Sequence, residues 1–185
     1  MISILFDTET TGLLLPSTAP LEKQPYIIEL GAVKVNEHGA VLGQLEQLLL
    51  PPVPITAEIT KITGIQQADV ADKPTFAEFL PRLIQFFSGA GHTRADTLIC
   101  HNAPFDTGML RNELLRAGCE EFPWPTETIC TVAEYFPLLG YRPSLQVLYK
   151  TIIGTELEQA HRGLDDVHAM LAVLCKDGFF QKVAQ

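Results

Sequence analysis

The segment that most constrains the fold is the stretch from Ser3 to Gly12, which reads SILFDTETTG. A short, mainly apolar run leads into two carboxylates and then a Thr-Thr-Gly turn. Alternate side chains of a strand share a face, so Asp7 and Glu9 are expected on one side and Thr8 on the other. Two adjacent carboxylates repel each other unless a proton or a cation lies between them. A hard divalent cation such as Mg²⁺ or Mn²⁺ would relieve that repulsion, whereas an ordinary acidic turn after a strand is the plainer alternative.

Composition limits the classes that the chain can belong to. With 185 residues, 46% hydrophobic and 19% charged, we expect a globular chain with one domain over 1–185. No apolar run is long enough for a bilayer span and no basic leader is evident, so we expect a cytoplasmic protein with no membrane partner. The four cysteines form no CxxC pair, which favours free thiols in a reducing compartment.

The charge balance argues against a long nucleic-acid footprint. There are 13 Lys and Arg residues against 22 Asp and Glu residues, a formal net charge of −9. A protein that holds a long duplex by its phosphates normally has a basic face. An acidic metal site would explain part of the excess, and any contact with nucleic acid is expected to be short.

Hydrophobic periodicity predicts an α/β fold with a mixed sheet. Three strand-like segments come first and suggest an antiparallel meander, and segments with helical spacing follow. A proline-rich loop lies between the first two strands. The expected elements after the first strand are strands at 26–35 and 40–50, helices at 56–63 and 75–87, a strand at 97–100, a helix from about 105, a strand turning into a helix over 128–136, a helix at 144–153 and a last helix that opens at Asp166.

Two more acids are expected at helix starts. Asp106 lies in the first turn of its helix, in phase with the apolar residues that follow, and Asp166 opens the last helix. Four carboxylates around one cleft fit a pair of divalent cations about 4 Å apart, which activate water and stabilise a leaving oxygen in phosphoryl displacement. His161 cannot share the helical face of Asp166, so we expect it in the preceding loop, where a neutral imidazole can accept the proton of the attacking water.

Three motifs in order resemble those of the DEDDh family, the DnaQ-like 3′→5′ exonucleases with an RNase H-like fold. They are DTETTG at 7–12, HNAPFD at 101–106 and HRGLDD at 161–166. The segments IIELGAV at 27–33 and TGI at 63–65 are also similar to family segments. The resemblance covers nearly the whole chain and implies a mixed five-stranded sheet flanked by helices, with the first three strands antiparallel.

The resemblance also implies roles for individual residues. The metal ligands would be Asp7, Glu9, Asp106 and Asp166, and His161 would be the general base. The family's spacing selects Asp166 over Asp165, which we expect to cap the last helix. Contacts to the 3′-terminal nucleotide would come from Thr10, Thr11, Gly12, Leu13 and Asn102.

We therefore expect an exonuclease that uses two divalent ions, Mg²⁺ or Mn²⁺, to release nucleoside 5′-monophosphates from the 3′ end of single-stranded nucleic acid. DNA is favoured, in proofreading or repair of the kind associated with bacterial DNA polymerase III, so a polymerase is a possible partner. The alternatives are an RNA exonuclease of the oligoribonuclease or RNase T type, a non-catalytic polymerase-associated subunit, and a metal-dependent phosphatase or other small-molecule hydrolase. Trp124 and Phe122 are candidates for base stacking, although for Trp124, which is flanked by prolines, a structural plug is the preferred interpretation. His101 is open between a place near the site and a packing role.

Overall fold

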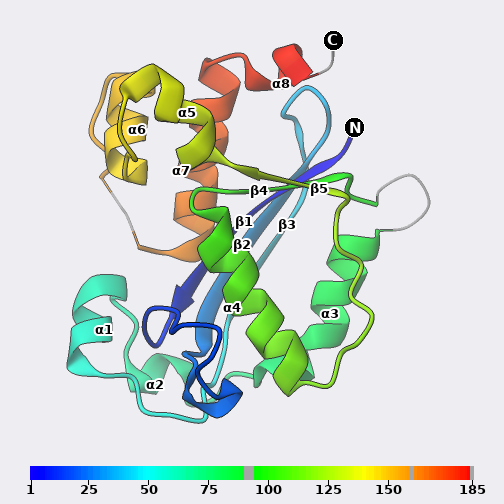
Figure 1. Ribbon diagram of the computed structural model, residues 1–185, viewed down its shortest axis with the longest axis vertical. Coiled ribbons are helices and arrows are strands. Elements are labelled where there is room, and N and C mark those ends of the chain that lie inside the picture. Colours follow the sequence, from blue (N-terminus) through cyan, green and yellow to red (C-terminus); the bar gives the residue numbers. More distant parts are fainter. Residues whose placement is uncertain (90–93, 159–160, 184–185) are drawn as a thin grey trace.

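The computed structural model describes residues 1–89, 94–158 and 161–183 (Figure 1). Its centre is a five-stranded mixed sheet in the order β3-β2-β1-β4-β5. The first three strands, β1 (Ser3–Thr10), β2 (Ile27–Val35) and β3 (Val41–Leu48), pair antiparallel. β4 (Thr97–Cys100) and β5 (Glu127–Cys130) add parallel strands on the other side of β1. The predicted mixed sheet and its antiparallel start are confirmed.

The helices follow the order that the sequence predicts, with three short additions. They are the 3-10 turn η1 (Leu21–Lys23) and the α-helices α1 (Ala57–Thr63), α2 (Gln67–Val70), α3 (Phe76–Ser88), α4 (Ala103–Arg116), α5 (Thr131–Leu139), α6 (Leu145–Ile153), α7 (Gly163–Lys176) and α8 (Phe179–Val183). Hydroxyl side chains of Thr56, Thr75 and Ser144 cap α1, α3 and α6. Among the described helices, none is both long and apolar enough to cross a membrane.

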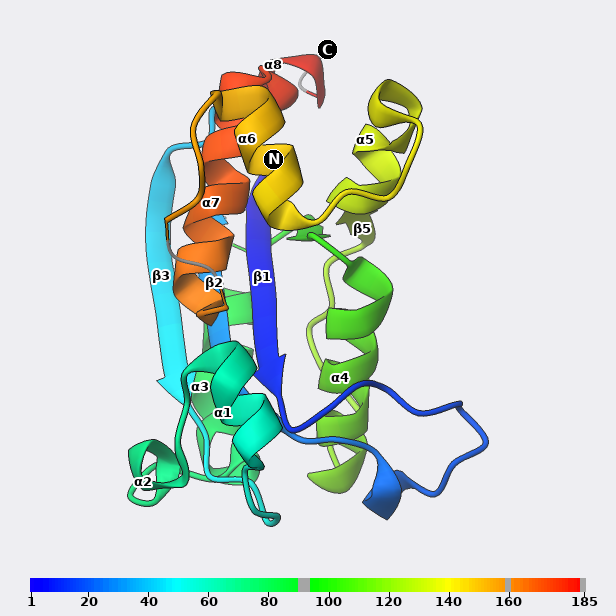
Figure 2. The ribbon, with the colours of Figure 1, turned by 90° about the vertical axis from the view of Figure 1, so that its left-hand side faces the viewer.

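Alternation along β1 sends its side chains into two separate cores. Ile4 and Phe6 pack with α3 and α4 on one face of the sheet, and Leu5 packs with α6 and α7 on the other. Figure 2 shows α7 in front of the sheet and α3 behind it. Phe122 and Trp124 pack against the first of these cores, which confirms the preferred interpretation of Trp124 as a packing residue.

The start of α7 differs from the expectation. The helix begins at Gly163 with Arg162 at its N-cap, so Asp165 is an exposed first-turn residue and the prediction that it caps the helix is wrong. The helix starts early because its first turn lies directly on β2. A Cβ atom added at Gly31 would be 2.2 Å from the carbonyl carbon of Gly163. Glycine at both positions therefore permits a backbone contact that a side chain would prevent.

Candidate active site

The first strand runs between the N-terminal turns of α4 and α7, and these turns carry the other two predicted acids. A cleft of about 390 Å³ opens there and is lined by Asp7, Asn102, His161 and Asp166, among other residues. Burial raises the pKa of Asp7 well above its ordinary value, and the charges of Asp106 and Asp166 raise it further. The structure thus brings acids from three separate elements within electrostatic reach of one another.

Thr8 positions the carboxylate of Asp106, the predicted acid on α4. The Asp106 carboxylate is buried, and its Oδ1 accepts hydrogen bonds from the Thr8 backbone N–H at 3.1 Å and from the Thr8 hydroxyl at 2.9 Å. Thr8 therefore points to the face opposite that of its two acidic neighbours, as strand alternation predicts. Burial raises the pKa of Asp106 to about 7, and the two bonds from Thr8 oppose that rise. Thr8 of β1 therefore holds the Asp106 carboxylate beside the strand.

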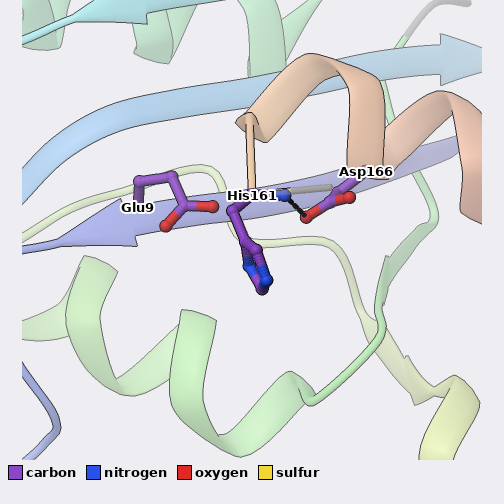
Figure 3. Close-up of side chains that lie close together, drawn as sticks. All are labelled: Glu9, His161 and Asp166. Carbon is purple, nitrogen blue, oxygen red and sulfur yellow. Dashed lines mark hydrogen bonds between the residues drawn. The ribbon is translucent and has the colours of Figure 1, made fainter. Parts of the chain in front are cut away.

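Glu9, His161 and Asp166 form the tightest group of possible ligands. One ligand atom from each lies within 4.8 Å of the other two (Figure 3). Both carboxylates are 9% exposed, and His161 is exposed at the mouth of the cleft. Burial and the charges of Asp166 and Glu29 raise the pKa of Glu9 to about 8. In the absence of a cation, this carboxylate is therefore protonated through much of the neutral range.

One carboxylate oxygen in this group lacks a partner. Asp166 Oδ2 accepts the backbone N–H of His161 at 3.1 Å, whereas the buried Oδ1 has no hydrogen bond within the described part of the chain. Buried polar atoms in native proteins are almost always bonded. Oxygen donors with no proton donor of their own are what a hard divalent cation requires. The residues present fit such a cation, with Asp7, Glu9, Asp106 and Asp166 as its candidate ligands.

An ion pair between the exposed Arg162 and the buried Glu29 holds the start of α7 over the strand. Glu29 is fully buried on β2, directly opposite Glu9 in the register of the two strands. Its carboxylate accepts bonds from Arg162 Nε at 3.0 and 3.1 Å, from Arg162 Nη2 at 2.7 Å and from the Gly163 N–H at 2.9 Å. Sequence reasoning assigned no role to either charge. The available signal was a glutamate among the apolar residues at the start of the second strand, because a carboxylate is rarely buried without a charged or hydrogen-bonding partner.

The comparison with protein families decides the class. Residues 4–174 match the model of the RNase T exonuclease family. The chain belongs to this exonuclease family. Its fold and its relatives place it with the DEDDh exonucleases, so the chain is a nuclease of the hydrolase class.

Curated relatives of this exonuclease include replication proteins. The chain is 31% identical to the DNA polymerase III subunit epsilon of Treponema pallidum, over 90% of this chain and 71% of that protein. It is 32% identical to a PolC-type DNA polymerase III of Clostridium perfringens, over 92% of this chain. It spans only 11% of the length of that polymerase.

Solved structures give the same fold. The nuclease domain of 3′hExo, a DEDDh family member bound to rAMP, superposes with a TM-score of 0.75 at 20% identity and covers 96% of this chain and 92% of that chain. Exonuclease X in complex with 5′ overhanging duplex DNA superposes with a TM-score of 0.65 at 28% identity, over 94% and 89% of the two chains. The expected RNase H-like fold is confirmed.

The candidate substrate residues of the exonuclease differ in what their side chains do. The Thr10 hydroxyl donates to the Gly12 carbonyl at 2.7 Å, and the Thr11 hydroxyl accepts the Tyr26 N–H at 2.9 Å. These two threonines therefore fix the turn after Glu9. Leu13 is 81% exposed beyond that turn, where an apolar side chain is free to meet a ligand.

Proposed function

We propose that this exonuclease removes nucleoside 5′-monophosphates, one at a time, from the 3′ end of single-stranded nucleic acid, with DNA as the preferred substrate. We also propose that residues 1–185 act as one exonuclease domain that uses two divalent cations, Mg²⁺ or Mn²⁺. The observation that carries the proposal is the group formed by Glu9, His161 and Asp166, whose ligand atoms lie within 4.8 Å of one another, in a chain that matches the exonuclease family over residues 4–174.

The carboxylates on β1, α4 and α7 would hold the cations. Bound divalent cations supply activation of the attacking water and stabilisation of the leaving oxygen. Thr8 holds Asp106 in place through two hydrogen bonds, and the Arg162–Glu29 pair holds the loop that carries His161. These contacts preorganise the cleft before substrate arrives, which lowers the cost of reaching the reactive arrangement.

His161 is the proposed general base. It precedes α7 and has a backbone φ of 71°, in the left-handed region, and its N–H is tied to Asp166. Figure 3 shows the imidazole pointing away from α7. A neutral imidazole at the cleft mouth can accept the proton of an attacking water and pass it to solvent. Exposure favours that second step because water reaches the ring directly.

Support for a DNA substrate and a polymerase partner comes from the relatives. The Treponema pallidum relative is a subunit of DNA polymerase III, and the chain covers 71% of it. We propose that this exonuclease likewise acts at DNA 3′ ends and associates with a polymerase. The acidic composition, a formal net charge of −9, suits a short footprint at the end of a strand rather than a grip on a long duplex.

Degradation of end-labelled oligonucleotides tests the proposal. Single-stranded DNA and RNA of one sequence, labelled at the 5′ or the 3′ end, are incubated with Mg²⁺ or Mn²⁺ and wild-type protein, Glu9→Gln or Glu120→Gln. We expect a ladder of shortening 5′-labelled products and immediate mononucleotide release from the 3′ label, both lost with chelator and in Glu9→Gln. Glu120 is exposed outside the cleft, so its variant is the matched control. Internal cleavage, or mononucleotide release from the 5′ label, would refute the proposed direction.

A further inference from the structure

The link between α5 and α6, residues 140–144, forms a wall of the active-site cleft. Arg142 and Pro143 line the same cleft as Asp7 and Asp166. Figure 2 shows the link between α5 and α6 passing beside β1 and above the start of α4. Arg142 is exposed, and its Nη2 is 3.5 Å from Asn102 Oδ1, which is at the limit of a hydrogen bond. Its guanidinium is therefore close to the catalytic acids without being committed to any of them.

His101 fixes this link to the rest of the cleft. Its Nε2 is 3.1 Å from the Pro143 carbonyl, and its Nδ1 is 2.9 Å from the Thr131 hydroxyl. A carbonyl only accepts, so Nε2 carries the proton and, in a neutral ring, Nδ1 accepts from Thr131. His101 begins the HNAPFD segment that also delivers Asp106. One segment thus positions both a catalytic carboxylate and the backbone next to Arg142.

The charges in the cleft give Arg142 a specific task. The substrate strand carries one negative charge per phosphate, and the cleft is lined by the carboxylates of Asp7 and Asp166. Arg162, at the N-cap of α7, is bound to Glu29. Among the described residues that line the cleft, Arg142 is the one with a permanent positive charge. A planar guanidinium matches the geometry of a phosphate group.

An exposed aromatic ring lies next to this cation. Tyr141 is 50% exposed, directly before Arg142 in the link. Proteins that bind single strands combine cations along the backbone with aromatic rings on which bases stack. The link carries both features at consecutive positions, with Arg142 lining the cleft and Tyr141 exposed next to it, away from the β1 turn where the 3′-terminal nucleotide is expected.

We propose that the α5–α6 link holds the substrate strand upstream of the scissile phosphate, with Arg142 contacting a phosphate and Tyr141 offering a stacking surface to a base. This inference rests on the proposed exonuclease function and deepens it, because it assigns the strand a path along one wall. Arg142 is a substrate-contacting residue in this arrangement, and His101 is a positioning residue that acts through the link.

Two substrates separate upstream binding from chemistry. One is a single-stranded DNA oligonucleotide, and the other is the 4-nitrophenyl ester of thymidine 5′-monophosphate, which has a scissile phosphate and no upstream nucleotide. For Arg142→Ala we expect KM for the oligonucleotide to rise about tenfold, with a loss on the ester that is several times smaller. The slope of log KM against log salt should fall by about 0.7, the value for one phosphate contact on a single strand.

Arg82→Ala is the matched control, because it removes the same charge from an exposed position on α3. Equal losses of Arg142→Ala on both substrates, or an oligonucleotide KM and salt slope equal to those of Arg82→Ala, would overturn the inference. If wild-type protein hydrolyses neither substrate, the proposed function fails, and fluorescence anisotropy of a labelled oligonucleotide then decides on Arg142. Weaker binding by Arg142→Ala than by Arg82→Ala would support the strand path, and equal binding would overturn it.

Discussion

Removing the charge of Glu9 should stabilise the metal-free protein. The same change should abolish the candidate cation site. Burial, followed by the charges of Asp166, Glu29 and Asp106, raises the pKa of Glu9 from 4.5 to about 8. The folded protein therefore binds this proton more tightly than the unfolded chain does. Stability is lost as pH rises from 4.5 toward 8, because the unfolded chain ionises freely and the folded chain does not.

The size of the effect follows from the two pKa values. At 1.36 kcal/mol per tenfold change in proton affinity, the raised pKa costs about 1 kcal/mol near pH 5 and about 4 kcal/mol at pH 8. Glutamine keeps the shape of glutamate and removes its charge. Metal-free Glu9→Gln should therefore exceed wild type in free energy of unfolding by about 2 to 4 kcal/mol at pH 8, and by about 1 kcal/mol or less near pH 5.

Urea unfolding with chelator at both pH values measures this difference, with Glu120→Gln as the control for loss of an exposed charge. Added Mn²⁺ should then stabilise wild type and have little effect on Glu9→Gln. If Glu9→Gln is no more stable than wild type at pH 8, or if its advantage is the same at both pH values, burial and the neighbouring carboxylates do not raise the pKa of Glu9 as the structure indicates.

Three further predictions concern the parts that support the site. Gly31→Ala should lower the free energy of unfolding by about 2 kcal/mol or more, because the new Cβ would be 2.2 Å from the Gly163 carbonyl carbon; Gly43→Ala, whose nearest neighbour is 3.9 Å away, should cost much less in the same urea titration. Mn²⁺ at about 100 times its Kd should add about 2.7 kcal/mol to the stability of wild type at pH 8, measured by thermal unfolding and reversed by chelator; no shift would argue against a cation site. Thr8→Val should lower kcat about tenfold in a folded protein, because Asp106 loses its hydroxyl donor; unchanged kcat would remove Thr8 from the positioning contacts.

Local sequence patterns predicted most of the structure within individual strands and helices. Strand alternation correctly separated Thr8 from Asp7 and Glu9, and the Thr8–Asp106 bond confirms it. Cap residues at Thr56 and Ser144 correctly marked helix starts. The short helices α2 and α8 were missed because four or five residues are too few to show a helical period.

Contacts between residues far apart in the sequence could not be predicted from local sequence patterns. Glu29 and Arg162 are 133 residues apart, and only the folded chain shows that they bind each other next to His161. The early start of α7 likewise depends on contact between two glycines on different elements. The placement of Arg142 over the cleft depends on the bond from His101 to Pro143, which no spacing rule predicts.

The most direct test of the catalytic carboxylates compares two adjacent acids. Asp166 is 9% exposed and lines the cleft, whereas Asp165 is exposed on the first turn of the same helix. The rate of shortening of a 5′-labelled single-stranded DNA with Mn²⁺ should fall at least about 100-fold in Asp166→Asn, because Asp166 would help hold the cation that stabilises the leaving oxygen, and change only a few-fold in Asp165→Asn. Equal rates for the two variants would contradict the assignment of Asp166 to the metal site.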